Sequence, residues 1–190
     1  MTNQTDASSM SSNFFALFEQ PVGFEVNQSQ LDTQLRVLQK QHHPDNARDT
    51  HAQRQAEQTS AVINHAYQTL SHPDTRASYL LEMSGHAHNL EQSIADLDFL
   101  DDAMEMRMDL DDALAQHDQT TLRTLHPKVS DRLQTQSARF VTAYDEKAWE
   151  DAIDATQKLK FLVKLDADIR AGLDDVMQAA HDDGDDDLYM

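Results

Sequence analysis

The tripeptide His43-Pro44-Asp45 has the residue types of a contact point for another protein. Pro44 fixes its own φ and stiffens the backbone, and Asp45 can accept a charge-assisted hydrogen bond from a partner's arginine. Arg36 and Lys40 are four residues apart, so they share one face of the helix predicted just before the tripeptide. This small positive face is expected to steer the loop toward an acidic groove on a partner.

Other kinds of site chemistry find little support. The chain has no Cys, which excludes disulfides, thiolate zinc sites and cysteine nucleophiles. The ten His residues include no helical His-x-x-x-His pair with an acidic neighbour, and they are interpreted as surface or capping residues. The acidic segment 182–187 lacks the glycine position and closing Glu of a calcium loop. We therefore predict no catalytic residue, no metal, no cofactor and no enzymatic activity.

The charge of the chain is negative and unevenly spread. The formal net charge is −19 over 190 residues, which argues against nucleic acid or an anionic membrane as a partner. Residues 12–84 hold five basic and eight acidic residues, whereas residues 85–190 hold ten and 25. The two halves are expected to meet different partners. The polar start and the lack of a long apolar stretch favour a cytoplasmic protein.

The elements that position the tripeptide are predicted to be helices, because Gly, Pro and β-branched runs are scarce. In the first half the apolar spacing predicts a helix that Ser29 caps and that ends near Gln41, before Pro44. The other helices predicted there cover about 13–18, 52–70 and 76–83. In the second half, helices over about 96–117, 120–144 and 147–180 predict an antiparallel three-helix bundle. Pro127 is expected to kink the middle helix or to mark its start.

The first half resembles a J domain. The tripeptide lies between two long helices, Phe14-Phe15-Ala16-Leu17-Phe18 is similar to the family's aromatic opening, and segments 63–70 and 76–79 are similar to its third and fourth helices. The resemblance implies that His43, Pro44, Asp45, Arg36 and Lys40 bind a DnaK-type chaperone and trigger its ATP hydrolysis. Asn46 stands where the family often has Lys. The second copy of the tripeptide text, at 72–74, is interpreted as the turn between the third and fourth helices.

The second half resembles the C-terminal domain of the HscB family. Segments 98–110, 149–152 and 158–165 carry the likeness. HscB proteins partner a chaperone of the HscA type and present to it an iron–sulfur scaffold protein of the IscU type. The resemblance implies a scaffold-binding patch made of Leu100, Asp101, Met104, Glu105, Met108, Asp112 and Phe161. Asp101 stands where the family commonly has Met, and Met108 stands where it commonly has Glu.

Periodicity by itself leaves the patch open. The helix from Asp96 has two apolar stripes, one through Phe99, Ala103, Met106, Leu110 and Leu114, the other through Leu97, Leu100, Met104 and Met108. Both stripes could be core in a three-helix bundle, or the second could be a binding surface. Phe161 lies off the stripe that Trp149, Ile153 and Val163 predict for its helix. An isolated surface aromatic can also be without function.

The sequence therefore predicts an all-α protein in which a J domain, a helical hairpin with short flanking helices, is joined to a C-terminal three-helix bundle. The predicted boundaries are a disordered start over 1–11, a J domain over 12–84, a linker over 85–94, the scaffold-binding domain over 95–180 and a disordered acidic tail over 181–190. The predicted function is that of a monomeric co-chaperone in iron–sulfur cluster assembly. The alternatives are a J-domain protein with an unrelated client or a general holdase role, and a helical adaptor with no chaperone link.

Overall fold

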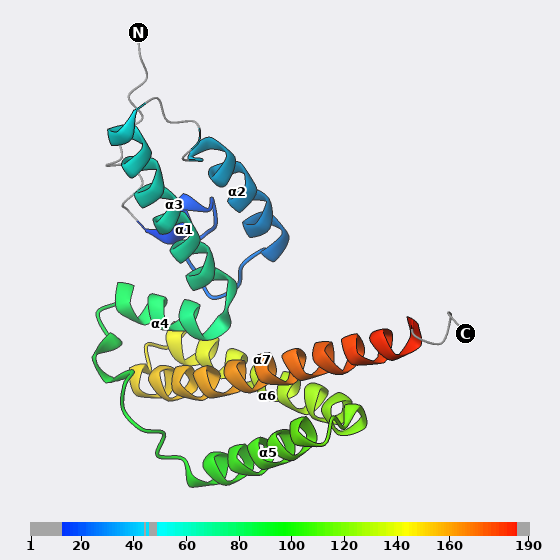
Figure 1. The fold of residues 1–190 in the computed structure, drawn as a ribbon. Coiled ribbons are helices and arrows are strands. Elements are labelled where there is room, and N and C mark those ends of the chain that lie inside the picture. Colours follow the sequence, from blue (N-terminus) through cyan, green and yellow to red (C-terminus); the bar gives the residue numbers. More distant parts are fainter. Residues whose placement is uncertain (1–12, 44, 46–48, 186–190) are drawn as a thin grey trace. The chain divides into compact units, whose positions relative to one another are not determined.

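The computed structural model describes residues 13–43, 45 and 49–185. Within these residues the regular secondary structure is helical, and there is no strand. Pro44 and the predicted disordered segment 1–11 lie outside the described residues, as does 186–190. The chain divides into two compact units, one ending at Ser84 and the other beginning at Gly85. The elements, shown in Figure 1, are α1 (Phe14–Leu17), α2 (Gln28–Gln41), α3 (Thr50–Ser71), α4 (Pro73–Met83), η3 (Ala87–Asn89), α5 (Leu97–Ala115), α6 (Gln119–Asp145) and α7 (Trp149–Asp185).

Side-chain caps set the starts of the helices in the first unit. Asn27 caps α2 by accepting a hydrogen bond from the Gln30 amide at 3.1 Å, so the predicted cap at Ser29 is wrong by two residues. Asn has a short acceptor that satisfies an orphan N–H at a helix start, which is why it competes successfully with Ser. Asp49 caps α3 through the amides of His51 and Ala52 at 2.9 and 2.8 Å.

The helix α4 begins earlier than predicted. Pro73 is the first residue of α4, whereas the sequence predicted that Pro73 would break the chain and that the helix would begin three residues later, at Arg76. Proline is well suited to this position, because its missing N–H would have no intrahelical partner there and its φ is already helical. His72 is the residue between α3 and α4, so the second copy of the tripeptide text forms a tight helix junction.

A small core holds the first unit together. The apolar faces of α1, α2, α3 and α4 meet in it, and its fully buried side chains include Phe15, Phe18, Leu31, Ile63, Leu70, Leu80 and Leu81. Each such side chain contributes roughly 1.5–3 kcal/mol relative to an exposed one. Arg76 is also buried, lies over the Phe24 ring at 4.9 Å from its centroid and donates to the carbonyl of Leu70. Burial lowers the pKa of Arg76 to about 10.

In the second unit α5, α6 and α7 pack together, as the bundle prediction expects. The two turns that join these helices are built alike. His117 and Lys147 have φ of 52° and 58°, and the next residue's amide bonds back to Ala113 O and Ala143 O, each at 2.8 Å. This is the geometry that ends a helix with a residue in the left-handed region and reverses the chain within three residues.

The core of the second unit corrects two expectations. On α7 the buried face runs through Leu159, Leu162, Leu165 and Ile169, so the stripe predicted through Trp149, Ile153 and Val163 is only partly right. Pro127 lies inside α6, which starts at Gln119, so Pro127 does not mark the start of the helix. The helix α7 continues to Asp185, five residues beyond its predicted end. Among the described residues, no helix combines the length and apolar character needed to span a membrane.

Candidate functional site

The corner that follows α2 exposes the side chains predicted to contact a partner. The side chains of His43 and Asp45 are 56% and 88% exposed. The backbone amide of Asp45 donates to Nδ1 of His43 at 3.2 Å. Because Nδ1 accepts that bond, the proton of the neutral imidazole sits on Nε2, where it can be donated to a partner. The Asp45 carboxylate remains at the surface as an acceptor.

Hydrogen bonds between α2 and α3 fix the base of this corner. The Ser60 hydroxyl donates to the carbonyl of His42 at 3.1 Å, one residue before His43. One turn further from the corner, Gln39 donates to Asn64 at 3.1 Å. At the other side of the loop, the Asp49 cap lowers the pKa of that carboxyl group, chiefly through its bond from the Ala52 amide. The corner is therefore held by both of the helices that flank it.

A polar network at the far end of α2 completes the hairpin. The Tyr67 hydroxyl donates to Asp32 at 2.8 Å, and Gln28 donates to Asp32 and to Tyr67 at 2.9 and 3.3 Å. The bond to Asp32, together with burial, raises the pKa of Tyr67. This network and the corner contacts tie α2 to α3 at both ends.

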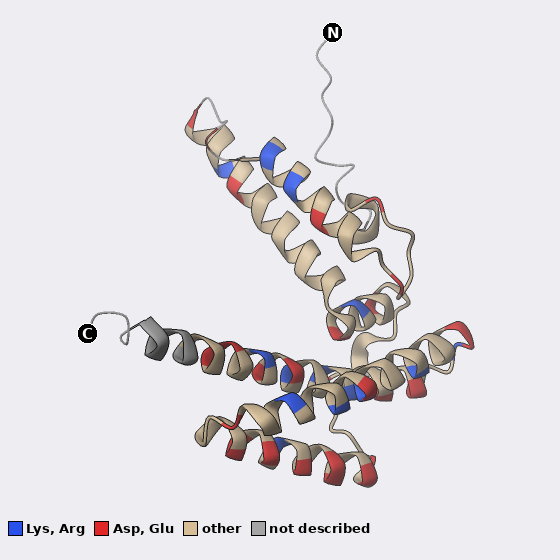
Figure 2. Cartoon of the chain, turned by 90° about the vertical axis from the view of Figure 1, so that its right-hand side faces the viewer, with Lys and Arg blue, Asp and Glu red and all other residues tan. Residues whose placement is uncertain are grey.

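Arg36 and Lys40 are both exposed on the outer side of α2. They are the basic residues of α2 and give it the blue segments seen in Figure 2. Lys40 lies in the last turn of the helix, where the macrodipole favours a positive charge. Both cations thus lie exposed on the helix that precedes the corner.

On α5 the second apolar stripe is largely exposed. Leu97, Met104 and Met108 are 74%, 63% and 65% exposed, whereas Phe99, Ala103, Met106 and Leu110 of the first stripe are buried. Met104 and Met108 follow Leu97 by seven and eleven residues, which places all three within roughly 20° of one line along the helix. The exposed line is roughly 16 Å long. The interpretation that both stripes are core is therefore wrong for these three residues.

Acidic side chains lie along one side of this line, at roughly 40–120° from it around the helix. Figure 2 shows red segments recurring along α5. Five exposed carboxylates have no ion-pair partner in the described part of the chain: Asp98, Asp101, Glu105, Asp109 and Asp112. An apolar line with unneutralised acidic residues along one side fits a partner surface that is apolar at its centre and basic along one edge.

Phe161 lies at the seam between α5 and α7, and Leu100 lies off the exposed line, on the side of α5 that faces α7, within roughly 20° of Arg107, which bonds to Asp168 of α7. Leu100 and Phe161 are both partly buried, and the Phe161 ring meets the Phe99 ring edge to face at 6.1 Å between centroids. Phe161 packs against the bundle core, so the idea of an idle surface aromatic is wrong. The seven predicted patch residues therefore divide into an exposed group on α5 and a half-buried pair, Leu100 and Phe161.

Sequence reasoning missed two residues of this region. Leu97 was placed in the stripe but not in the predicted site, although it is the most exposed large apolar side chain described. Its spacing from Met104 and Met108 was the available signal. Lys158 is almost fully buried, although a charged side chain is normally exposed to solvent. Asp154, four positions earlier, predicts an ion pair on the helix surface and not burial, so the sequence carries no signal for the enclosed lysine.

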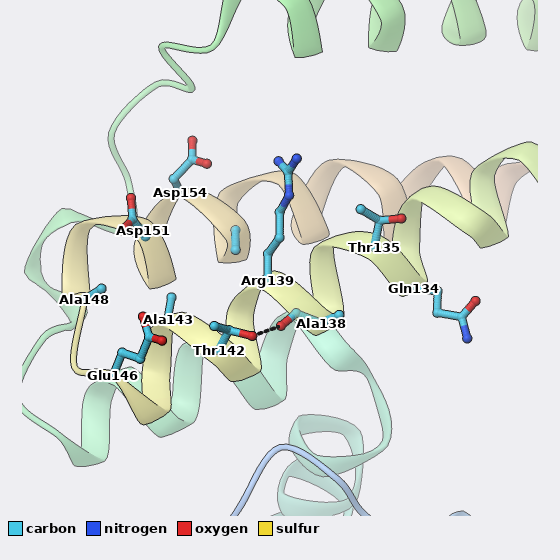
Figure 3. A pocket seen from close by; sticks show the side chains of 11 residues that line it. Gln134, Thr135, Ala138, Arg139, Thr142, Ala143, Glu146, Ala148, Asp151 and Asp154 are labelled. Atoms are coloured by element: carbon cyan, nitrogen blue, oxygen red, sulfur yellow. Dashed lines mark hydrogen bonds between the residues drawn. The ribbon is translucent and has the colours of Figure 1, made fainter.

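A hollow of about 720 Å³ lies between the end of α6 and the start of α7. Figure 3 shows Arg139 and Asp154 projecting on the same side of this helix pair. Small side chains, among them Ala138, Ala143 and Ala148, leave the space open. In the described residues no three His, Cys, Asp or Glu side chains gather as metal ligands, here or elsewhere.

Two family models match the chain, one in each unit. The model described as the DnaJ domain matches residues 22–79, and the one described as the HSCB C-terminal oligomerisation domain matches residues 95–170. The "Co-chaperone protein HscB homolog" of Acinetobacter baumannii is 37% identical over 165 residues, which cover 87% of this chain and 92% of the relative. A homologue of the same description from Acinetobacter baylyi is 36% identical and covers 93% of this chain and 99% of the relative.

Solved structures agree with these matches. Chaperone HscB from Vibrio cholerae superposes with a TM-score of 0.69 at 35% identity, covering 86% of this chain and 99% of that one. The predicted all-α architecture, a J domain followed by a C-terminal helical domain, is thereby confirmed. The J-domain match begins after α1, so the likeness of residues 14–18 to an aromatic opening stays a prediction.

Proposed function

This chain belongs to the HscB family of J-domain co-chaperones, and we propose that it couples an iron–sulfur scaffold protein to the ATPase cycle of a DnaK-type chaperone. In this proposal the first unit binds the chaperone, of the HscA type, and stimulates its ATP hydrolysis. The second unit binds the scaffold, of the IscU type. The cytoplasmic location and the monomeric state stay predictions.

The single observation that supports the chaperone half most strongly is the geometry of the exposed corner. His43 offers Nε2–H and Asp45 offers a carboxylate, while Ser60 holds the preceding backbone in place. A donor and an acceptor held on a stiff turn can bind a partner with little loss of conformational entropy. Arg36 and Lys40 would then guide the corner to an acidic groove. Pro44 belongs to the proposed contact as well, although it lies outside the described residues.

The scaffold half rests on the α5 face and the adjoining seam. We assign scaffold binding to Leu100, Asp101, Met104, Glu105, Met108, Asp112 and Phe161, and we add Leu97. The methionines suit an irregular partner surface, because their side chains are unbranched and adaptable. Holding both partners on one chain raises the effective concentration of each for the other.

A steady-state ATPase assay of the cognate DnaK-type chaperone tests the proposal, with and without the scaffold protein. Wild type should stimulate hydrolysis, and the scaffold should increase the stimulation further. His43→Gln should abolish both effects, because the amide side chain cannot reproduce the imidazole that Asp45 orients. Thr33→Ala, an exposed change farther from the corner on α2 whose hydroxyl bonds only within its own helix, is the matched control and should retain most of the stimulation.

Equal rates for wild type and His43→Gln would refute the assignment of the corner. Stimulation that is unaffected by scaffold, combined with binding to unfolded model substrates, would favour the alternative of a general holdase.

A further inference from the structure

The start of α5 is attached to α7 by a buried cation. The Lys158 side chain is only 3% exposed, and its Nζ donates to Asp96 and to Asp154, each at 2.7 Å. Nζ also lies 5.5 Å from the centroid of the Phe99 ring. Desolvation lowers the pKa of Lys158, but the hydrogen bonds from Lys158 to Asp154 and Asp96 outweigh it, so the pKa is raised and the ammonium stays charged at neutral pH.

Asp96 has two tasks in this arrangement. One carboxylate oxygen accepts the Phe99 amide at 3.0 Å and so caps α5, while the other accepts the ammonium of Lys158. Asp154 lies one turn before Lys158 on α7 and holds the lysine side chain against its own helix. The first turn of α5 is thereby joined to a fixed point on α7 through one residue.

Two further ion pairs attach α5 to its neighbours, but their cations are exposed. Arg132 of α6 bonds to Asp102 at 2.7 Å, and Arg107 bonds to Asp168 of α7 at 2.6 Å. The two arginine side chains are 49% and 40% exposed, so water and salt screen these pairs and their contribution is small. The ammonium of Lys158 is shielded from solvent, so its attachment is screened least of the three.

The cost of burying a lysine suggests a role beyond stability. An apolar side chain in the same place is often as stable or more so, whereas a buried ion pair can specify one arrangement of the elements it joins. The elements here are those that carry the seam: Leu100 follows Phe99 on α5, and Phe161 lies one turn after Lys158 on α7. Lys158 and Phe161 both contact the Phe99 ring.

We propose that Lys158, acting through Asp96 and Phe99, is a positioning residue that fixes Leu100 relative to Phe161 for scaffold binding. The inference rests on the proposed function of the α5 face. Lys158 itself, being buried, makes no contact with the scaffold. Without the Lys158 ammonium, the first turn of α5 would sample more than one position. The scaffold would then bind only the fraction of molecules in which that turn has the binding-competent position.

Isothermal titration of the scaffold protein into full-length variants tests this inference. Lys158→Met should bind the scaffold about tenfold more weakly, equivalent to about 1.4 kcal/mol. Arg132→Met is the matched control, because it removes the exposed ion pair that attaches α5 to α6. It should change the affinity for the scaffold less than about twofold. Both variants should stimulate the chaperone normally without scaffold, since the J domain is untouched.

A double-mutant cycle separates positioning from loss of stability. Leu100→Ala should weaken binding in the wild-type background and have a smaller effect in Lys158→Met, while its effect should be unchanged in Arg132→Met. If Lys158→Met fails to fold, Asp96→Asn replaces it, because Asn still caps α5 and removes only the charge that pairs with Lys158.

The outcomes distinguish the two proposals. If wild type does not bind the scaffold, the proposed function fails and this inference fails with it. If wild type binds and Lys158→Met binds equally well, the positioning role alone is refuted. Additive effects of Lys158→Met and Leu100→Ala would also refute it, because they would indicate a general loss of stability.

Discussion

The two units solve the problem of presenting a binding surface in different ways. At the corner, His43 and Asp45 are exposed, and the backbone just before them is held by a hydrogen bond between the neighbouring helices α2 and α3. The face on α5 is a line on one regular helix, and its position relative to the seam depends on residues about 60 positions away on α7. A local motif can therefore be recognised in the sequence, whereas a surface assembled from distant helices has to be built by packing.

The two surfaces also differ in the sign of their charge. The corner follows two exposed cations of α2, whereas the α5 face is bordered on one side by five carboxylates that have no ion-pair partner among the described residues. Two surfaces of opposite sign on one chain favour two different partners and disfavour exchange between them. Two predictions test how separate the surfaces are, and a third tests the charged pair that attaches α5 to α7.

The largest effect is expected from truncating the patch. The triple variant Leu100→Ala, Met104→Ala and Phe161→Ala should bind the scaffold about 100-fold more weakly, because central apolar side chains of an interface carry much of its binding energy. Adding Leu97→Ala should weaken binding further if the exposed line extends to that residue. Titration calorimetry measures both changes, and ATPase stimulation without scaffold should stay at the wild-type level.

The control for this series is Met177→Ala, which removes a methionine of α7 that is 59% exposed. It should leave scaffold affinity unchanged. Phe161 also packs against the bundle core, so the melting temperature of each variant has to be measured alongside its affinity. A loss of chaperone stimulation by the folded triple variant would show that the two surfaces are not separate.

A smaller effect is expected from reversing the charge on α2. The double variant Arg36→Glu and Lys40→Glu should stimulate the chaperone with about tenfold lower apparent affinity at low salt, because attraction to an acidic groove becomes repulsion. The deficit should shrink as ionic strength rises, since exposed charges are screened. Scaffold affinity should be unaffected. A deficit that is independent of salt would argue for a structural role of these side chains.

The smallest effect concerns acid stability of the second unit. The bond from Lys158 and the Phe99 amide hold the pKa of Asp96 below its usual 3.8. A carboxyl group whose pKa is lowered by folding adds stability above its unfolded pKa and loses it as pH falls through the folded value. Wild type should therefore melt above Asp96→Asn at pH 7, and the gap should close as the pH falls below 3.8, through the lowered pKa of Asp96. A gap of constant size across that range would contradict the charged pair.

Much of the first unit could be predicted because its signals are local. Leu31, Leu35 and Leu38 define the apolar face of α2, and Pro44 follows the helix. The errors there were local as well: Asn27 and not Ser29 caps α2, and Pro73 begins a helix. Several residues compete for a cap with similar free energies, so the sequence favours a helix start without deciding it.

The second unit shows the limit of such reasoning. Periodicity separated two apolar stripes on α5, but a stripe does not specify which neighbouring helix covers it. Only packing of α5 against α6 and α7 decided that Phe99 and Leu110 are buried while Leu97 and Met108 are exposed. The same packing enclosed Lys158, a charge that its helix alone would leave in water. Helical periodicity is a property of the chain, whereas burial is a property of what the folded chain places beside it.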